Sequence, residues 1–445
     1  MSMPKKFHAS HRFFEKLPGK LMIKNVRVVD TEENLDAVRT IIIYNGKITD
    51  ILDKAPSAFD GEVFASENSV LMPGFFDMHV HFREPGREDE ETLESGSYTA
   101  ANGGFTGVAC MPNTEPAIDN QEVINFILEE SKDFLVDIYP VAAVTKARAG
   151  NELAPIAEMV EAGAVAISDD GSPIMNAEIM RRALEYSKMF DIPILGHEED
   201  ANLSHNRHMH EGFFSTKLGL QGIPSLSEEI LVARDIMLTE FTGGKFHVCH
   251  ISSAGSVELV RQAKSKGLAV TCEVTPHHFT LTDKEVESFD TNTKMNPPLR
   301  SKQDVQAILE GLKDGTIDVI ATDHAPHSHE EKEAEYIYAP FGITGLETAL
   351  GLILAQLYKT KIISLKDIYD RCVKNPRKIL NLDLPRIKKG KTANLTYFSL
   401  DDQWIHKQSV SFSKSKNTPF GQHPLMGRTI AVINKGKIFR TPPLK

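Results

Sequence analysis

Histidine is the residue type in this chain that points most clearly to chemistry, because several of its 17 histidines stand at the ends of apolar segments. His79 and His81 are two residues apart, and side chains at i and i+2 of a β-strand project from the same face. Both imidazoles can therefore bind one metal ion. An isolated His-x-His pair also arises by chance, so the pair needs support from other residues.

Further side chains of ligand type end other apolar segments of the chain. They are Asp169, Asp170, His197, His247, His250, Asp323, His324 and His327. One tetrahedral ion needs four ligands. The His-x-His pair, together with two further strand-end histidines and two strand-end carboxylates, offers more ligands than that. They suffice for two ions about 3.5–4 Å apart that share a carboxylate. Imidazole and carboxylate without thiolate suit zinc, with manganese or cobalt as alternatives.

Such a site would activate water. Metal coordination lowers the pKa of water from about 15.7 to near 7, so hydroxide is present at neutral pH. A carboxylate beside that water can accept its proton and later deliver it to a leaving nitrogen. The residue types therefore indicate hydrolysis of an amide-like bond, or the reverse reaction.

Eight short apolar segments alternate with helix-like segments in the middle of the chain. They are residues 75–81, 104–111, 134–143, 163–168, 191–197, 245–252, 268–276 and 317–326. Nearly continuous apolar strands that alternate with helices indicate an α/β fold with a covered parallel sheet. Eight units predict a (β/α)8 TIM-type barrel, whose active site gathers at the C-terminal ends of its strands. A doubly wound open sheet is the alternative.

The two ends of the chain differ from the middle and resemble each other. Short strands rich in Ile and Val are predicted at residues 21–30, 39–52, 393–400 and 428–440, with turn signals at Asn45-Gly46 and Lys435-Gly436. We predict one small β domain built from both termini, although two unrelated caps are the alternative. The predicted boundaries are 1–72 and 381–445 for this domain and 73–380 for the barrel, with a polar loop at 327–340 and a closing helix at 345–358.

Composition limits the class of protein. The chain has 445 residues, 41% hydrophobic and 25% charged, with a net charge of −11, which is typical of a globular protein and argues against nucleic acid as the main partner. No apolar run is long enough to span a membrane, and the N-terminal 14 residues do not resemble a signal peptide. Four cysteines without a Cys-x-x-Cys pair suit a reducing cytoplasm.

Several motifs resemble those of one family, in that family's order. They are HVHFREPG (79–86), MPNTEP (111–116), SDDGSP (168–173), GHEED (196–200), HVCHIS (247–252), EVTPHH (273–278), KMNPPLR (294–300) and ATDHAPH (321–327). The resemblance is to dihydroorotases of the amidohydrolase superfamily, and it is closest to their long bacterial form. It extends from about residue 20 to the C-terminus.

The resemblance implies a zinc cofactor, one or two ions per chain, and a role for each ligand. His79 and His81 would bind the more buried metal, and Asp170 would bridge the two ions. The second ion would be held by His197 and His250. Asp323 would contact the first metal and act as the general acid/base.

The bridging position departs from many amidohydrolases, which use a carboxylated lysine. Residues 161–176 contain no lysine, so an aspartate would bridge, as in one dihydroorotase branch. Strand alternation places Asp169 and Asp170 on opposite faces, so only one of them should be a ligand. Similar sequences favour Asp170. Because aspartate is shorter than carboxylated lysine, occupancy of the second site is left open.

The resemblance also implies four substrate contacts. Arg83 lies two residues after His81 and can offer its planar fork to a carboxylate, although an ion pair with Glu84 is the alternative. Asn113 and His327 would complete the carboxylate pocket. Asn296 would hydrogen-bond the pyrimidine ring, or serve only as a turn residue before two prolines.

The implied activity is reversible cyclisation of N-carbamoyl-L-aspartate to L-dihydroorotate in pyrimidine biosynthesis, with metal-bound hydroxide as the nucleophile. The expected partners are this small-molecule substrate and, as in similar proteins, a second copy in a homodimer. An allantoinase or hydantoinase-type amidase is one rival interpretation. A non-catalytic barrel that serves another pyrimidine enzyme as a scaffold is another.

The remaining reactive side chains are expected to be structural. His205, His208 and His210 lie in a polar segment and are read as a solvated loop. His277 and His278 are not ligands in the family and should support the site or the fold. Cys249 should face away from the metal by strand alternation and act as a small buried hydrophobe.

Overall fold

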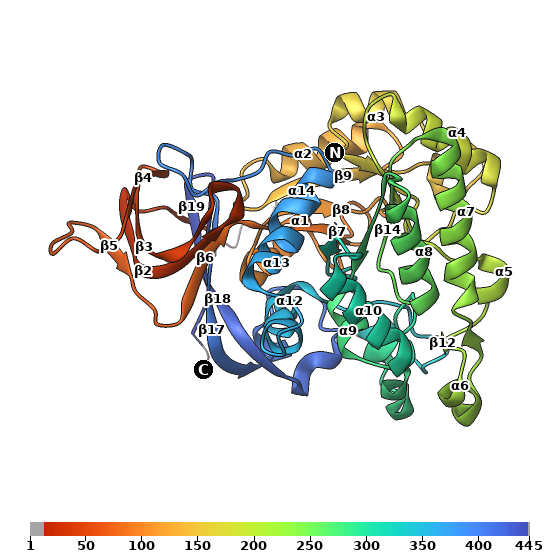
Figure 1. Cartoon of the computed structure of the whole chain (residues 1–445). Coiled ribbons are helices and arrows are strands. Elements are labelled where there is room, and N and C mark those ends of the chain that lie inside the picture. Colours follow the sequence, from red (N-terminus) through yellow and green to blue (C-terminus); the bar gives the residue numbers. More distant parts are fainter. Residues whose placement is uncertain (1–12, 444–445) are drawn as a thin grey trace, which may run out of the picture.

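The computed structural model describes residues 13–443, which form two large sheets (Figure 1). Residues 1–12 and 444–445 lie outside this range. The expectation about a signal peptide in the first 14 residues therefore falls mostly outside the described residues. One sheet has eight strands and the other nine, and a two-stranded sheet joins β12 (Met209–His210) to β13 (Gly222–Ile223).

The eight-stranded sheet is a closed parallel barrel. Its strands are β7 (Phe75–Val80), β8 (Phe105–Cys110), β9 (Asp137–Ala142), β10 (Ala166–Ile167), β11 (Ile194–Gly196), β14 (Phe246–Val248), β15 (Val270–Val274) and β16 (Val319–Ile320). Each pairs with its neighbour in chain order. The first and last positions also join, because Val80 bridges His324 and the His81 amide donates to the His324 carbonyl at 2.9 Å. The predicted (β/α)8 barrel is confirmed, and an open doubly wound sheet is excluded.

Helices surround the barrel. They are α1 (Leu93–Gly103), α2 (Gln121–Ser131), α3 (Ile156–Ala162), α4 (Ala177–Lys188), α7 (Leu226–Thr242), α8 (Ala254–Ser265), α10 (Lys302–Asp314) and α12 (Leu346–Leu352). Shorter helices lie in the connections: α5 (Ala201–Ser204), α6 (Phe213–Leu218), α9 (Pro276–Thr280), α11 (His329–Lys332), α13 (Leu365–Tyr369) and α14 (Asn375–Ile379). The predicted closing helix is α12, which continues as a wider helical segment over Ile353–Tyr358. None of the helices in residues 13–443 combines the length and apolar character needed to cross a bilayer.

The strands bury two apolar faces, as expected for a sheet covered on both sides. Residues such as Val108 and Val248 belong to the outer cluster packed against the helices, whereas Met78, Ala109 and Leu195 belong to a cluster in the barrel interior. β7 contains a bulge, because its pairing with β8 shifts by one residue between Asp77 and Val80. A bulge interrupts the alternation of faces. Met78 lies in the interior apolar cluster, and His79 lies among the buried ligand-type residues.

The nine-stranded sheet joins both ends of the chain. Its strands are β1 (Glu15–Lys16), β2 (Lys20–Asp30), β3 (Leu35–Tyr44), β4 (Lys47–Leu52), β5 (Glu62–Phe64), β6 (Ser69–Pro73), β17 (Leu395–Ile405), β18 (Pro424–Asn434) and β19 (Lys437–Arg440). β17 pairs antiparallel with β6, which unites the two halves. The predicted single β domain is confirmed, and the residue numbers of the domain boundaries stay a prediction. Asn45-Gly46 and Lys435-Gly436 turn with positive φ at both residues, which is typical of tight hairpins.

Candidate active site

The six predicted metal ligands meet at the C-terminal ends of the barrel strands, which we call the barrel mouth. Asp170 lies at their centre, because its carboxylate oxygens are 3.4–3.7 Å from ring nitrogens of all four histidines. Asp323 Oδ1 lies 2.8 Å from His81 Nε2 and 3.4 Å from His79 Nε2. Residues far apart in the sequence therefore form one buried cluster. Three overlapping groups in it have ligand atoms close enough to share an ion: His79, His81 and Asp170; His79, His250 and Asp323; Asp170, His197 and His250.

Unpaired atoms in this cluster fit a metal. Among the described residues, His79 Nε2, Asp170 Oδ1 and His250 Nδ1 are buried without a hydrogen-bond partner. Buried polar atoms are nearly always paired, so each exception needs an explanation. A divalent cation would satisfy the first two, which point at each other across 3.4 Å. The donor set of imidazoles and carboxylates suits such an ion.

The charges of the cluster lead to the same conclusion. Burial opposes protonation of His79, but the carboxylates of Asp323, Glu273 and Asp170 outweigh it and raise the pKa of His79 well above its usual value. Burial would raise the pKa of Asp323, yet the neighbouring His79 and His81 hold that pKa below its usual range. Buried carboxylates concentrated in this way stabilise positive charge, which either protons or a metal ion can provide.

Two polar side chains orient the first histidine pair. Glu273 Oε1 lies 2.6 Å from His79 Nδ1, and Asn113 Oδ1 lies 2.7 Å from His81 Nδ1. Each contact leaves the Nε2 atom of its ring directed toward the cluster. Asn113 was expected to contact substrate, and here it contacts a predicted ligand. Glu273 was missed, although a glutamate at the end of a buried apolar strand was a visible signal in the sequence.

The predicted carboxylate pocket is held together by Glu90. Arg83 Nε lies 3.1 Å from Glu90 Oε2, and His327 Nδ1 lies 3.0 Å from Glu90 Oε1. Arg83 Nη2 and His327 Nε2 are 3.4 Å apart. The ion-pair partner of Arg83 is thus the buried Glu90, whereas Glu84 accepts from the Leu93 amide. Sequence reasoning missed Glu90, because nothing in REDEE distinguishes its buried carboxylate from exposed ones.

Asn296 lies on the other side of the cluster, beside the second histidine pair. Its Nδ2 donates to Glu199 Oε2 at 2.8 Å, and Glu199 Oε2 lies 3.2 Å from His197 Nε2. His197 Nδ1 lies 2.9 Å from His250 Nε2. Asn296 is therefore part of the network around the cluster. Glu199 was not recognised from the sequence.

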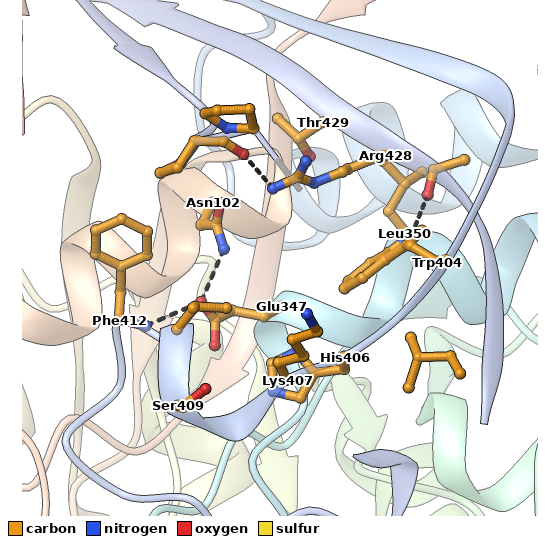
Figure 2. A pocket seen from close by; sticks show the side chains of 16 residues that line it. Asn102, Glu347, Leu350, Trp404, His406, Lys407, Ser409, Phe412, Arg428 and Thr429 are labelled. Atoms are coloured by element: carbon orange, nitrogen blue, oxygen red, sulfur yellow. Dashed lines mark hydrogen bonds between the residues drawn. The ribbon is translucent and has the colours of Figure 1, made fainter. Parts of the chain in front are cut away.

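A C-terminal strap, residues 411–417, reaches the barrel mouth from the β-domain side. Asn417 Oδ1 accepts from the His327 amide at 3.1 Å, and its Nδ2 donates to the carbonyls of Ala325 and Gly342. The strap begins beside a cavity of about 600 Å³ lined by Trp404 and Arg428, among others. Figure 2 shows Glu347 in this cavity, accepting from Asn102 and from the strap. The cavity contains none of the predicted site residues.

The two adjacent aspartates point apart. Asp169 accepts hydrogen bonds from the amides of Val144 and Thr145 at 2.8 and 3.0 Å, so it stabilises the loop that follows β9. Asp170 alone faces the histidines, which is the arrangement expected from strand alternation.

Cys249 corrects the sequence analysis. It was expected to face away from the cluster, but it lies in the barrel interior within 4.8 Å of ligand atoms of His79 and Glu273. β14 ends at Val248 and His250 has φ +31°, so strand alternation no longer applies. Its expected burial is correct, because the side chain is 2% exposed.

His210 is a second correction. His205 is exposed as expected, but His210 is buried beside Arg300, with 3.4 Å between His210 Nδ1 and Arg300 Nη1. The short sheet formed by β12 and β13 carries it inward. His277 and His278 are buried, and His278 bonds Thr275 and the Pro297 carbonyl, which agrees with a structural role for His278.

Comparison with solved structures agrees with this fold. The fold matches L-hydantoinase (dihydropyrimidinase) from Arthrobacter aurescens with a TM-score of 0.82 at 23% identity, over 96% of this chain and 97% of that one. Dihydropyrimidinase from Brevibacillus agri NCHU1002 gives 0.79 at 20%, over 94% of each chain. The chain therefore has the barrel fold of these hydantoinases, and its site consists of residues able to hold metal.

Sequence comparison narrows this class to one family. A dihydro-orotase-like family model matches residues 68–256. The dihydroorotase of Syntrophus aciditrophicus (strain SB) is 47% identical over 94% of this chain and 99% of its own length, and that of Pelotomaculum thermopropionicum is 48% identical over 94% and 98%. The chain belongs to the dihydroorotase family and is a cyclic amidohydrolase.

Proposed function

We propose that this enzyme interconverts N-carbamoyl-L-aspartate and L-dihydroorotate, with zinc held by His79, His81, Asp170, His197, His250 and Asp323. The observation that carries the proposal is the central place of the Asp170 carboxylate, within 3.7 Å of all four imidazoles. A carboxylate in that position can serve two ions at once. A bound divalent cation supplies Lewis acidity, which makes water a nucleophile at neutral pH and polarises a carbonyl.

Asp323 is the proposed general acid/base. It is ionised, because its pKa is held low by His79 and His81, and it is nearly buried at the barrel mouth. In ring opening, Asp323 accepts the proton of the attacking water as the carbonyl carbon–nitrogen bond breaks, and it then protonates the leaving ring nitrogen. In ring closure it removes the proton from the carbamoyl nitrogen.

The substrate carboxylate is proposed to meet Arg83, Asn113 and His327. Arg83 and His327 are already joined through Glu90, so both are preorganised. Asn296 is proposed to hydrogen-bond the pyrimidine ring. A guanidinium recognises a carboxylate by charge-assisted hydrogen bonds, which favours dihydroorotate over cyclic amides without a carboxylate.

The test compares wild-type enzyme with Asp323→Asn and Asp323→Ala, after metal analysis of each protein. Wild type should contain zinc and hydrolyse dihydroorotate, and the variants should lose about 10²- to 10⁴-fold in kcat. Hydantoin and allantoin serve as comparison substrates. Wild-type kcat in Asp323→Ala would contradict the mechanism, and faster turnover of hydantoin than of dihydroorotate would contradict the substrate.

A further inference from the structure

Arg148 is a half-buried cation beside the barrel mouth, in the loop that follows β9. Its Nη2 donates to the main-chain carbonyl of Asp170 at 2.7 Å and to Ser172 Oγ at 3.1 Å. Within residues 13–443, no carboxylate accepts a hydrogen bond from its guanidinium. Its Nε is buried without a hydrogen-bond partner. Buried charges are usually paired and buried polar atoms are nearly always bonded, so this side chain needs an explanation.

The backbone that carries Arg148 is held in an unfavourable conformation. Ala147 and Arg148 have φ of +51° and +55°, a region that residues other than glycine adopt uncommonly. The Ala147 amide donates to Asp119 Oδ2 at 2.8 Å. The Gly150 amide donates to Thr145 Oγ1 at 2.9 Å. Backbone strain that the surrounding structure enforces is concentrated at functional sites, so the enforced position of Arg148 points to a function.

Arg148 borders the same space as Asn113, which is proposed to contact the substrate carboxylate. A Cβ atom at Gly171 would lie 3.6 Å from Arg148 Nη2 and 4.0 Å from Asn113 Nδ2. Gly171 is exposed and has no side chain to occupy this space. Asn113 uses Oδ1 to contact His81, and its Nδ2 is the atom on the side of Gly171. A substrate held by Asn113 and the ligand cluster would therefore lie close to Arg148.

The two molecules that the proposed reaction interconverts differ in charge. N-carbamoyl-L-aspartate has two carboxylates, whereas L-dihydroorotate has one, because the other has become a ring carbonyl. Addition of hydroxide to that carbonyl gives the reacting molecule a second negative charge, which a fixed cation stabilises. In the open-chain molecule and in the transition state, this second charge is on the reacting group. The reacting group would be held at the cluster around Asp170.

We propose that Arg148 recognises this second charge and therefore binds the open-chain dianion and the transition state more strongly than dihydroorotate. The inference rests on the proposed function. It assigns different tasks to two arginines: Arg83 binds the carboxylate that both molecules share, and Arg148 responds to the charge that appears on ring opening. Both hydrogen bonds of Arg148 leave from Nη2, so other N–H groups of the guanidinium can bind an anion. A guanidinium stays charged in proteins.

This assignment predicts how the effect divides between KM and kcat. An enzyme leaves the equilibrium between substrate and product unchanged, so a variant loses the same factor in kcat/KM in both directions. Removing a contact made only to the dianion and the transition state raises the KM of ring closure and leaves its kcat unchanged. In ring opening the same loss appears in kcat, and the KM for dihydroorotate stays constant.

The first test measures both directions with wild type, Arg148→Gln and Arg148→Lys, all loaded with zinc. In Arg148→Gln, the KM for N-carbamoyl-L-aspartate should rise and the kcat of dihydroorotate hydrolysis should fall, each by about 10- to 100-fold, as for a charge-assisted hydrogen bond. Arg148→Lys keeps the charge and should recover most of both losses. Arg182→Gln, at an exposed arginine of α4 that pairs with Glu178, is the matched control and should behave as wild type.

Metal content and circular dichroism should be the same in all four proteins. Three results would overturn the inference: unchanged kinetics in Arg148→Gln, a higher KM for dihydroorotate at unchanged kcat, or equal losses in the Gln and Lys variants. The last result, or loss of metal from Arg148→Gln, would limit Arg148 to holding the loop around Asp170. A wild type without activity on dihydroorotate would contradict the proposed function itself, which separates the two failures.

The second test removes the charge from the ligand instead of the protein. N-carbamoyl-L-asparagine has an amide in place of the reacting carboxylate, so it has one negative charge. This compound and N-carbamoyl-L-aspartate are compared as inhibitors of dihydroorotate hydrolysis. The preference of wild type for the aspartate compound, taken as the ratio of inhibition constants, should fall by about 10- to 100-fold in Arg148→Gln. An unchanged ratio would overturn the proposal.

Discussion

The Nδ1 atom of His79 lies 2.6 Å from Oε1 of Glu273, and both side chains are completely buried. A carboxylate at Nδ1 favours, for the neutral ring, the tautomer whose Nε2 is unprotonated, which is the form that can bind a metal ion. That atom faces Asp170 and Asp323 at 3.4 Å each. Carboxylates that orient a histidine in this way strengthen metal binding.

We therefore expect Glu273→Gln to weaken metal binding by about 10- to 100-fold, because the amide no longer supplies a negative charge to His79. Competition with a chelator of known affinity measures this directly. Glu258→Gln, at an exposed residue of α8, is the control and should bind metal as wild type does. Equal affinity in the two variants would show that Glu273 does not support the site.

Arg83→Ala should raise the KM for dihydroorotate by about 10- to 100-fold, since a charge-assisted hydrogen bond to the substrate carboxylate contributes roughly 1.5–3 kcal/mol. The metal content should be unchanged, because the Arg83 hydrogen bonds involve the Pro326 carbonyl and His327, outside the cluster. Arg182→Ala is a matched control, because Arg182 is exposed on α4 and pairs with Glu178 at the surface. Unchanged kinetics in Arg83→Ala would remove the substrate assignment.

Asn417→Ala should affect substrate binding from a distance. The change removes three hydrogen bonds, two of them buried, that hold the loop of His327, so KM should rise while metal content stays at the wild-type level. The free energy of unfolding should fall by about 1–3 kcal/mol. Steady-state kinetics and urea unfolding measure the two effects. A loss of stability with unchanged KM would limit Asn417 to a structural role.

His210 should make stability depend on pH. Burial, assisted by Arg300, lowers the pKa of His210 to about 4, whereas the unfolded chain has the ordinary value near 6.5. Between these values the unfolded state binds more protons, so stability is lost as the pH falls through this window. From pH 7.5 to pH 5, the wild type should lose about 2 kcal/mol more than His210→Gln.

Urea unfolding at both pH values measures this difference. His205→Gln, at an exposed histidine five residues earlier, should keep the wild-type dependence. Identical losses in wild type and His210→Gln would contradict the prediction.

Most of the architecture could be predicted because its signals are local. Apolar strands such as 75–81 and amphipathic helices such as 177–190 can be predicted from hydrophobic periodicity, and the structure has β7 and α4 at these positions. The antiparallel hairpin of β3 and β4 was predictable from the turn signal Asn45-Gly46. Strand lengths were overestimated, as at 317–326, where β16 covers only Val319–Ile320. The longer runs continue past the sheet into the loops of the barrel mouth.

Errors occurred where a side-chain direction depends on a backbone irregularity. Strand alternation misplaced Cys249, because the chain has left β14 before that residue. A polar neighbourhood suggested that His210 is solvated, but distant residues around Arg300 cover it. The neighbouring residues in the sequence show neither where a strand ends nor which distant part of the chain will bury a side chain.

Residue types and their periodic placement were enough to establish a barrel, a β domain drawn from both termini and a set of ligand-type side chains at strand ends. Only the three-dimensional packing revealed that Asp170 lies among all four imidazoles. It also revealed that Glu273 orients His79 and that Glu90 holds Arg83 and His327, which are distant in the sequence or belong to another loop. The exposed large apolar side chains of α7 likewise became visible only in the structure. The physical reason is that periodicity reports which face of an element is buried. Distances between faces arise only when the barrel closes and the C-terminal strap packs on its mouth.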